Sequence, residues 1–218
     1  MMKPSFVISA FVLAFFFSGC RKFHQDKIVA DATPYTPTNL YPIERLPTYF
    51  NRVAVLPSFH ADSSSPALNY SDSIVLKELS KIGIFEPVSV SSQFCLKNFG
   101  KKRLSSAESL PGSFFKVIEE NFAANGVLFL ELHSFNSYRP LSIGIRAKLV
   151  DIKSGEFMWA VDETIDGGDA SVIVSAHAYE RNNYVQSLSA KTSSSILKSP
   201  RLFSKFAMNT IFSTLPNR

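Results

Sequence analysis

The sequence predicts an α/β fold, in which C-terminal helices pack on a mixed sheet of about five strands in the order β-α-β-α-β-β-β. Two observations lead to this prediction. Apolar runs alternate with helical periodicity over residues 52–126, which is typical of parallel strands joined by helices. Strict alternation with a tight turn follows over residues 127–165, which indicates an antiparallel meander. The 218 residues suffice for one such domain with extensions.

The first predicted strands flank a helix. Residues 53–56 are consecutive apolar residues, as in a strand covered on both faces. Residues 70–82 have helical spacing, and Gly83 ends that helix. Residues 84–90 form the second strand, near an edge of the sheet because Pro87 has no N–H to donate. The order strand, helix, strand implies a right-handed parallel crossover.

A second helix is predicted over residues 112–126, because Phe114, Ile118 and Phe122 recur on one face. The segment before it, residues 96–112, is polar and irregular. Three antiparallel strands of the meander follow the helix: residues 127–135, 142–152 and 156–165.

The last of these strands is predicted to place Phe157 and Trp159 on a shared face. After the sheet, residues 170–184 are predicted to form a helix. A final amphipathic helix begins at Ser199-Pro200. Packing of its apolar stripe on the sheet is favoured over a helix on a membrane surface. The stripe consists of Leu202, Phe203, Phe206, Ile211 and Leu215.

The amino terminus has the pattern of a removable signal peptide. Lys3 precedes an apolar run over residues 6–17 that is interrupted only by Ser9. At about 1.5 Å per residue, the longest version of this run gives roughly 22 Å of helix, short of the roughly 30 Å core of a bilayer. The segment therefore fits a signal peptide better than a membrane span.

The end of this segment resembles the signal of bacterial lipoproteins, in which an apolar residue and two small residues precede a lipid-bearing cysteine. The tetrapeptide Phe17-Ser18-Gly19-Cys20 matches that pattern. The resemblance implies cleavage before Cys20, acylation of Cys20 with fatty acids such as palmitate, and anchoring in the cell envelope. Because Arg21 rather than Asp follows, it also implies the outer membrane, facing the periplasm. The alternative is an uncleaved or ordinarily cleaved signal with an incidental cysteine.

The segment between the signal and the folded part is rich in proline and has no sustained periodicity. It is predicted to be an extended tether, although contact with the domain through Tyr41 and Ile43 stays open. Four parts are thus predicted: a signal peptide over 1–19, a lipidated cysteine and tether over 20–49, an α/β domain over 50–165 and a helical extension over 166–218.

The distribution of charge argues against a nucleic-acid partner, and the cysteine content argues against an intramolecular disulfide. The formal charge is +5, but Lys and Arg are spread along the chain, so we expect no nucleic-acid partner. If Cys20 is acylated, Cys95 is left without an intramolecular partner. A small buried side chain is the favoured interpretation of Cys95, ahead of a reactive thiol.

The strand that ends in Leu56-Pro57 and the residues Ala124-Asn125-Gly126 are similar to segments of periplasmic α/β lipoproteins. So is a turn containing Asp151 and Gly155 that is followed by Trp159. These segments resemble the curli-secretion lipoprotein CsgG, the penicillin-binding-protein activator lipoproteins and the amino-terminal domain of TolB. The resemblance covers roughly residues 50–165 and implies a fold. Asp151, Gly155 and Trp159 are structural turn residues in it and carry no chemistry.

A search for catalytic or metal-binding patterns finds little. The four histidines have neither ligand spacing nor a cysteine partner, so no metal site is expected. His60 with Asp62 is the best candidate for a site, but a solvated loop is favoured. The acidic stretch over residues 161–169 could bind a cation, but a turn at a strand end is favoured over a cation site.

These observations predict a lipoprotein that acts without catalysis as a partner-binding or assembly factor, with no cofactor. Its expected partners are the membrane, through the lipid, and another envelope protein; the oligomeric state stays open. The alternative is a subunit of an oligomeric CsgG-like secretion channel in the outer membrane. Against that alternative, no convincing pair of membrane strands is visible in the sequence.

Overall fold

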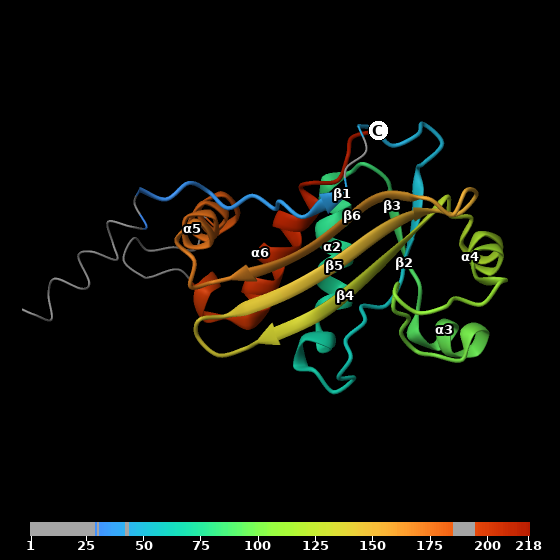
Figure 1. Ribbon diagram of the computed structural model, residues 1–218, viewed down its shortest axis with the longest axis horizontal. Coiled ribbons are helices and arrows are strands. Elements are labelled where there is room, and N and C mark those ends of the chain that lie inside the picture. The colour runs from blue at the N-terminus through green and yellow to red at the C-terminus, as the bar shows by residue number, and fades with distance from the viewer. Residues whose placement is uncertain (1–28, 30, 42–43, 185–194) are drawn as a thin grey trace, which may run out of the picture.

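The protein is described from a computed structural model, over residues 29, 31–41, 44–184 and 195–218. A six-stranded mixed sheet has the strand order β1-β6-β5-β4-β2-β3. The prediction of an α/β fold with a mixed sheet is therefore confirmed. In Figure 1 the long strands β4, β5 and β6 lie in front, with α2 and α6 behind them.

The parallel part of the sheet has the predicted strand, helix, strand order. Strand β2 (Arg52–Val55) leads through α2 (Ser71–Ile82) to β3 (Glu86–Ser89), which is parallel to β2. Gly83 ends α2 with φ at 69°. Strand β3 lies at the edge of the sheet, as Pro87 predicted.

Two helices connect β3 to the meander. Helix α3 (Ser92–Phe99) begins with Ser91 as its N-cap, and α4 (Phe114–Phe122) follows. Helix α3 occupies part of the segment that the sequence indicated as irregular. That prediction was wrong at residues 96–99, because burial of Cys95 stabilises a short helix there.

The meander consists of β4 (Gly126–Asn136), β5 (Ser142–Asp151) and β6 (Phe157–Asp166), paired antiparallel in sequence order. Strand β4 also pairs with β2 in parallel, which joins the two parts of the sheet. The predicted helix after the sheet is α5 (Ala170–Tyr184). The last predicted helix is α6 (Pro200–Phe212), in which the Ser199 side chain accepts a hydrogen bond from the backbone N–H of Leu202.

Two apolar clusters lie on opposite faces of the sheet. The first cluster packs α2, α5 and α6 against the meander and includes Trp159 and Phe206. The second, smaller cluster packs α3 and α4 against the ends of β2, β4 and β5. Packing of the α6 stripe on the sheet is thus confirmed by its buried members Phe203, Phe206 and Ile211. Among the described helices, none is both long and apolar enough to cross a bilayer.

The prediction that Phe157 and Trp159 share a face is wrong. Trp159 pairs with Leu149 in the first cluster, whereas Phe157 pairs with Val150, the next residue of β5. An irregularity in the register inserts one extra residue between them, so the two side chains point to opposite faces. Trp159 is 0% exposed and Phe157 is 49% exposed.

Part of the predicted tether lies against the domain. Strand β1 (Leu40–Tyr41) pairs with β6 and is the sixth strand, which the sequence did not indicate. We call residues 31–41 the strap. Tyr35 and Leu40 pack against the first cluster. Tyr41, one of the two proposed contacts, pairs with Ala160 of β6, although its side chain is 57% exposed. Ile43, the other proposed contact, and Cys20 lie outside the described residues.

Candidate functional site

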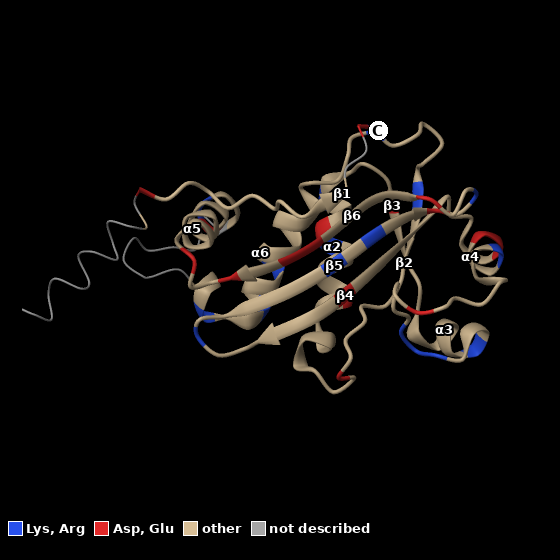
Figure 2. Ribbon diagram, viewed as in Figure 1, with Lys and Arg blue, Asp and Glu red and all other residues tan. Residues whose placement is uncertain are grey.

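The candidate site is the polar face of the meander, opposite the first cluster. Alternation along the strands directs apolar residues of β4, β5 and β6 toward α2 and α6, and their polar neighbours away from these helices. Helices α3 and α4 cover only the end of this face near β2. Figure 2 shows residues of opposite charge on adjacent strands of this face. The polar face consists of Glu131, His133, Arg146, Lys148, Phe157, Asp162 and Thr164.

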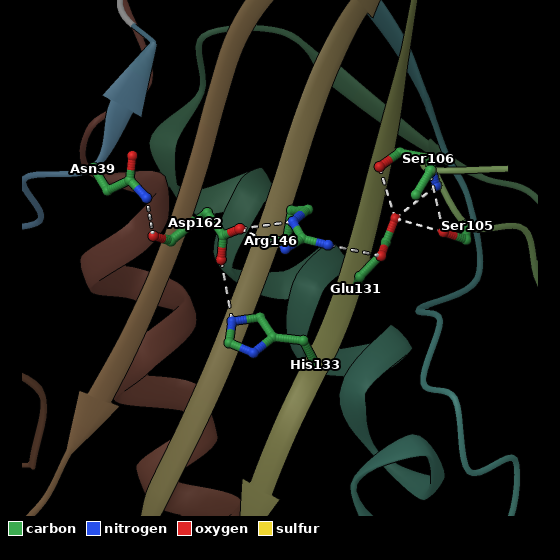
Figure 3. Close-up of polar contacts among 8 residues, drawn as sticks. Asn39, Ser105, Ser106, Glu131, His133, Arg146 and Asp162 are labelled. Carbon is green, nitrogen blue, oxygen red and sulfur yellow. Dashed lines mark hydrogen bonds and ion pairs between the residues drawn. The ribbon is translucent and has the colours of Figure 1, made fainter.

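Arg146 is the centre of a row of charges across three strands. In the register of the sheet, Arg146 lies opposite Glu131 on one side and Asp162 on the other. Its Nε donates to Asp162 Oδ2 at 2.7 Å, and its Nη2 lies 2.6 Å from the same oxygen. Its Nη1 lies 3.7 Å from Glu131 Oε2. Figure 3 shows the guanidinium between the two carboxylates, in an arrangement that orders all three side chains.

His133 joins this row because of a bulge in β4. The register shifts between Leu132 and Ser134, and His133 has no paired residue in β5. Its Nε2 lies 3.2 Å from Asp162 Oδ1. A Cβ atom at Gly144 would lie 2.1 Å from the His133 ring, so only glycine leaves space for the imidazole at that position. The bulge and Gly144 together place the ring against the sheet.

Glu131 links the row to the loop before α4. Its Oε1 accepts hydrogen bonds from Ser105 Oγ at 3.0 Å, Ser106 N at 2.6 Å and Ser106 Oγ at 2.7 Å. Glu131 is only 5% exposed, and these donors offset the cost of burying its carboxylate. Arg146 thus lies between this buried carboxylate and the partly exposed Asp162, to which its contacts are shorter.

An exposed aromatic residue lies next to Lys148 on the polar face. The Lys148 ammonium lies 5.6 Å from the centre of the Phe157 ring, within reach of a cation–π contact. Phe157 is among the most exposed large apolar residues of the described chain. Arginine and aromatic residues are enriched at protein interfaces, and here both are held in place on a rigid sheet.

The strap is attached to β6 beside the polar face. Glu163 accepts hydrogen bonds from Tyr35 Oη at 2.8 Å, Thr38 N at 2.5 Å and Asn39 N at 2.7 Å. Asn39 also donates from its side chain to the carbonyl of Asp162 at 2.9 Å (Figure 3). Burial alone would raise the pKa of Glu163, but the hydrogen bonds outweigh it and hold the pKa below its ordinary value.

We expect acid to weaken the attachment of the strap. A carboxylate with a lowered pKa stabilises the folded state fully above its unfolded pKa, and that contribution is lost as pH falls through the folded pKa. The NMR amide signals of Thr38 and Asn39 should therefore shift with acid titration in the wild type and not in Glu163→Gln. Glu120→Gln, on the exposed side of α4, is the matched control. An unchanged titration in Glu163→Gln would contradict the assignment.

The predicted turn residues lie together at one end of the β5–β6 hairpin. Gly155 has a φ of 72°, and its N–H donates to the Asp151 carbonyl at 2.9 Å. Asp151 Oδ2 accepts from Ser154 Oγ at 2.9 Å and from Tyr49 Oη at 3.2 Å. Trp159 is buried, and its indole N–H donates to Thr214 Oγ1 at 3.1 Å. These contacts are structural, and none of them reaches the polar face.

The other sequence candidates do not form a site. Asp62 accepts hydrogen bonds from both N–H and O–H of Ser64, and its own N–H donates to His60 Nδ1, which is local loop geometry. The acidic stretch is split between faces, because Asp162 contacts Arg146 while Glu163 contacts the strap. Within the described ranges, no three His, Cys, Asp or Glu side chains come together as a metal site would require.

Cys95 is fully buried in the second cluster. Burial raises the pKa of its thiol to about 11, so the thiolate that would react is scarce at neutral pH. The favoured interpretation of Cys95 as a small buried side chain is confirmed.

The polar face could not be recognised as a site from the sequence. Arg146 lies in the alternating segment 142–152, whereas Glu131 and Asp162 come from two other strands. Only the register brings the three together, and the His133 bulge leaves no recognisable pattern. The alternating charges of 142–152 were the one available signal.

Comparison with known proteins gives structural neighbours only. No protein-family model matches the chain, and no curated protein matches it. A PelC dodecamer from Paraburkholderia phytofirmans is 15% identical, with a TM-score of 0.48 over 82% of this chain and 96% of that one. Lipoprotein GNA1162 from Neisseria meningitidis is 16% identical, with a TM-score of 0.44 over 61% and 99%. The LpoB C-terminal domain from Escherichia coli is 18% identical, with a TM-score of 0.37 over 53% and 82%.

Bacterial lipoproteins are therefore among the solved structures that this chain resembles, and so is TolB from Acinetobacter baumannii, at 12% identity and a TM-score of 0.32 over 66% of this chain and 31% of that one. These low identities and scores assign no activity. The resemblance to the curli-secretion lipoprotein stays a prediction.

Proposed function

We propose that this chain is an envelope lipoprotein, anchored through acyl groups on Cys20, that binds a protein partner through the polar face and catalyses no reaction itself. The observation that supports this most is the ordered row of Glu131, Arg146 and Asp162 on a partly exposed sheet face. In this row Arg146 is 34% exposed in its side chain and Asp162 is 36% exposed.

The chemistry of the polar face suits binding rather than catalysis. Each charged group is engaged by a neighbour in the sheet, so the side chains are ordered before any partner arrives. Ordered side chains reduce the entropy cost of association. Phe157 offers an apolar anchor beside one cationic group, Lys148, on the same face as Arg146. A partner with carboxylates around an apolar recess would complement this surface.

The proposed location follows from the lipoprotein signal and from Arg21 after the anchor. We place the protein on the periplasmic side of the outer membrane, bound to the bilayer by the lipid. Three acyl chains, each contributing about 0.8 kcal/mol per buried CH2, would make this anchoring stable. The anchored protein could then contact a partner protein on the periplasmic side of the outer membrane.

The test is site-specific photo-crosslinking in living cells. A photo-reactive residue replaces Thr164, which is exposed on the polar face, and the matched control replaces Lys77, exposed on α2. We expect a crosslink to one envelope protein from position 164 and none from position 77. The crosslink should fall about tenfold or more with Phe157→Ser, which leaves the charged row in place.

Three outcomes would contradict the proposal. Equal capture from positions 77 and 164 would mean that the polar face is not the contact. A crosslink unaffected by Phe157→Ser and by Arg146→Glu would mean the same. Crosslinks only between copies of this chain, in a stable ring, would instead favour the oligomeric channel predicted as the alternative.

A further inference from the structure

A pocket of about 260 Å³ lies outside the carboxyl ends of β2 and β3, away from the polar face. Val55 at the end of β2 and Val90 after β3 form apolar parts of its wall. Leu76 of α2 adds a third apolar surface. Asp72, Ser91 and Ser92 supply the polar groups.

The strand order explains why a pocket forms at this point. From β2 the chain passes to α2, which packs in the first cluster, and from β3 it passes to α3, which packs in the second. The connections of two neighbouring parallel strands thus leave toward opposite faces of the sheet. Such a divergence opens a crevice at the strand ends, where open α/β sheets bind their ligands.

Asp72 provides an ordered acceptor on one side of the pocket. Its Oδ1 accepts a hydrogen bond from the backbone N–H of Ser58 at 2.7 Å, and its Oδ2 lies 3.2 Å from Arg103 Nη1. The carboxylate is still 39% exposed, and two carboxylate oxygens have about four acceptor positions. Asp72 can therefore still accept a hydrogen bond from an ammonium group.

Two buried hydroxyls beside Asp72 also have unused hydrogen-bonding capacity. The Oγ atoms of Ser58 and Ser71 have no hydrogen-bond partner within the described part of the chain, although each residue is only 1% exposed. Buried hydroxyls in proteins are normally bonded. The hydroxyls of Ser58 and Ser71 can thus form hydrogen bonds that the described part of the protein does not supply.

Donors lie on the other side of the pocket. Ser91 Oγ accepts from the backbone N–H of Phe94 at 3.1 Å as the N-cap of α3, which leaves the Ser91 hydroxyl hydrogen free to donate. Ser92 adds a second hydroxyl at the start of the same helix. These groups suit a carboxylate, while the free acceptor positions of Asp72 on the opposite side suit a donor such as an ammonium group.

We propose that this pocket binds a small zwitterion of amino-acid size. Its ammonium group contacts Asp72, its carboxylate contacts Ser91 and Ser92, and its side chain lies against Leu76 and Val90. The volume of about 260 Å³ lies just below the roughly 300–1,000 Å³ of typical ligand pockets and suits a ligand of amino-acid size better than a nucleotide. This site lies apart from the polar face, so a result that contradicts one of the two proposals leaves the other unaffected.

The experiment is a thermal-shift and calorimetric titration of the detergent-solubilised full chain with the free amino acids. We expect at least one amino acid to raise the melting temperature and to bind with a measurable Kd. Its N-acetyl derivative and its methyl ester, which each lack one charge, should bind about tenfold more weakly or worse. Absence of any response at millimolar concentration would overturn the proposal.

Two variants locate the binding. Asp72→Asn should weaken binding at least about tenfold by removing the charge that faces the ammonium. Because this change also affects Arg103, Ser89→Leu is the second variant; it fills the pocket from an exposed position of the edge strand. Lys77→Ala, on the exposed side of α2, is the control. Binding that survives Ser89→Leu, or binding of the N-acetyl and methyl ester derivatives as tight as that of the free amino acid, would overturn the proposal.

Discussion

Replacing Cys20 with alanine is expected to abolish fatty-acid labelling of the protein and to release it from the membrane fraction. The lipid would be joined to the thiol of Cys20, and alanine has no group that can form this bond. Without acyl chains, the hydrophobic transfer energy of about 0.8 kcal/mol per CH2 is lost. The measurement is metabolic labelling with a fatty-acid analogue, followed by fractionation of the cells.

Cys95→Ala is the matched control for this experiment, because Cys95 is the only other cysteine of the chain. It is buried, so its removal should leave labelling and membrane association unchanged. Equal labelling of Cys20→Ala and wild type would show that the lipid is attached elsewhere or that the protein carries none. The proposed compartment would then lose its basis.

Replacing Trp159 with alanine is expected to lower the free energy of unfolding by about 3–5 kcal/mol. Trp159 is 0% exposed, its ring centre lies 6.5 Å from that of Phe212, and its indole N–H donates to Thr214. Alanine would leave a cavity between β6 and α6 and remove that hydrogen bond. Urea unfolding should be followed by circular dichroism, since Trp159 is the only tryptophan.

The control is Phe157→Ala, two residues earlier in the same strand. Because the irregular register places Phe157 on the polar face at 49% exposure, its replacement should change stability by only about 0.5 kcal/mol. A loss as large as that of Trp159→Ala would mean that both side chains are buried in the same cluster. The described pairing of β5 with β6 would then be wrong.

Local patterns were sufficient to predict the main elements. The apolar runs and the helical spacing depend on how neighbouring residues share one face, which requires no knowledge of the rest of the chain. Residues 71–82 became a helix, and residues 142–151 became a strand with alternate residues buried. Pro87 also predicted an edge position, because the missing N–H excludes a central strand.

Interactions between distant segments could not be predicted in this way. The strap has no periodicity of its own, yet its last two residues, Leu40–Tyr41, form a strand because β6 offers an unpaired edge and Glu163 accepts two N–H groups of the strap. Residues 96–99 continue helix α3 because the side chain of Cys95 is buried in the second cluster. In both cases the stabilising partner lies elsewhere in the chain.

The sequence by itself determined the kinds of most elements and their order, because these depend on short-range patterns. At Cys20 it also contains the pattern that resembles a lipoprotein signal, and the proposed compartment depends on that resemblance. Only the tertiary structure decided that Glu131, Arg146 and Asp162 form one row, that Phe157 turns away from Trp159, and that a pocket opens between α2 and α3. The physical reason is that register, bulges and strand order are set by packing across the whole sheet, where one extra residue moves a side chain to the opposite face.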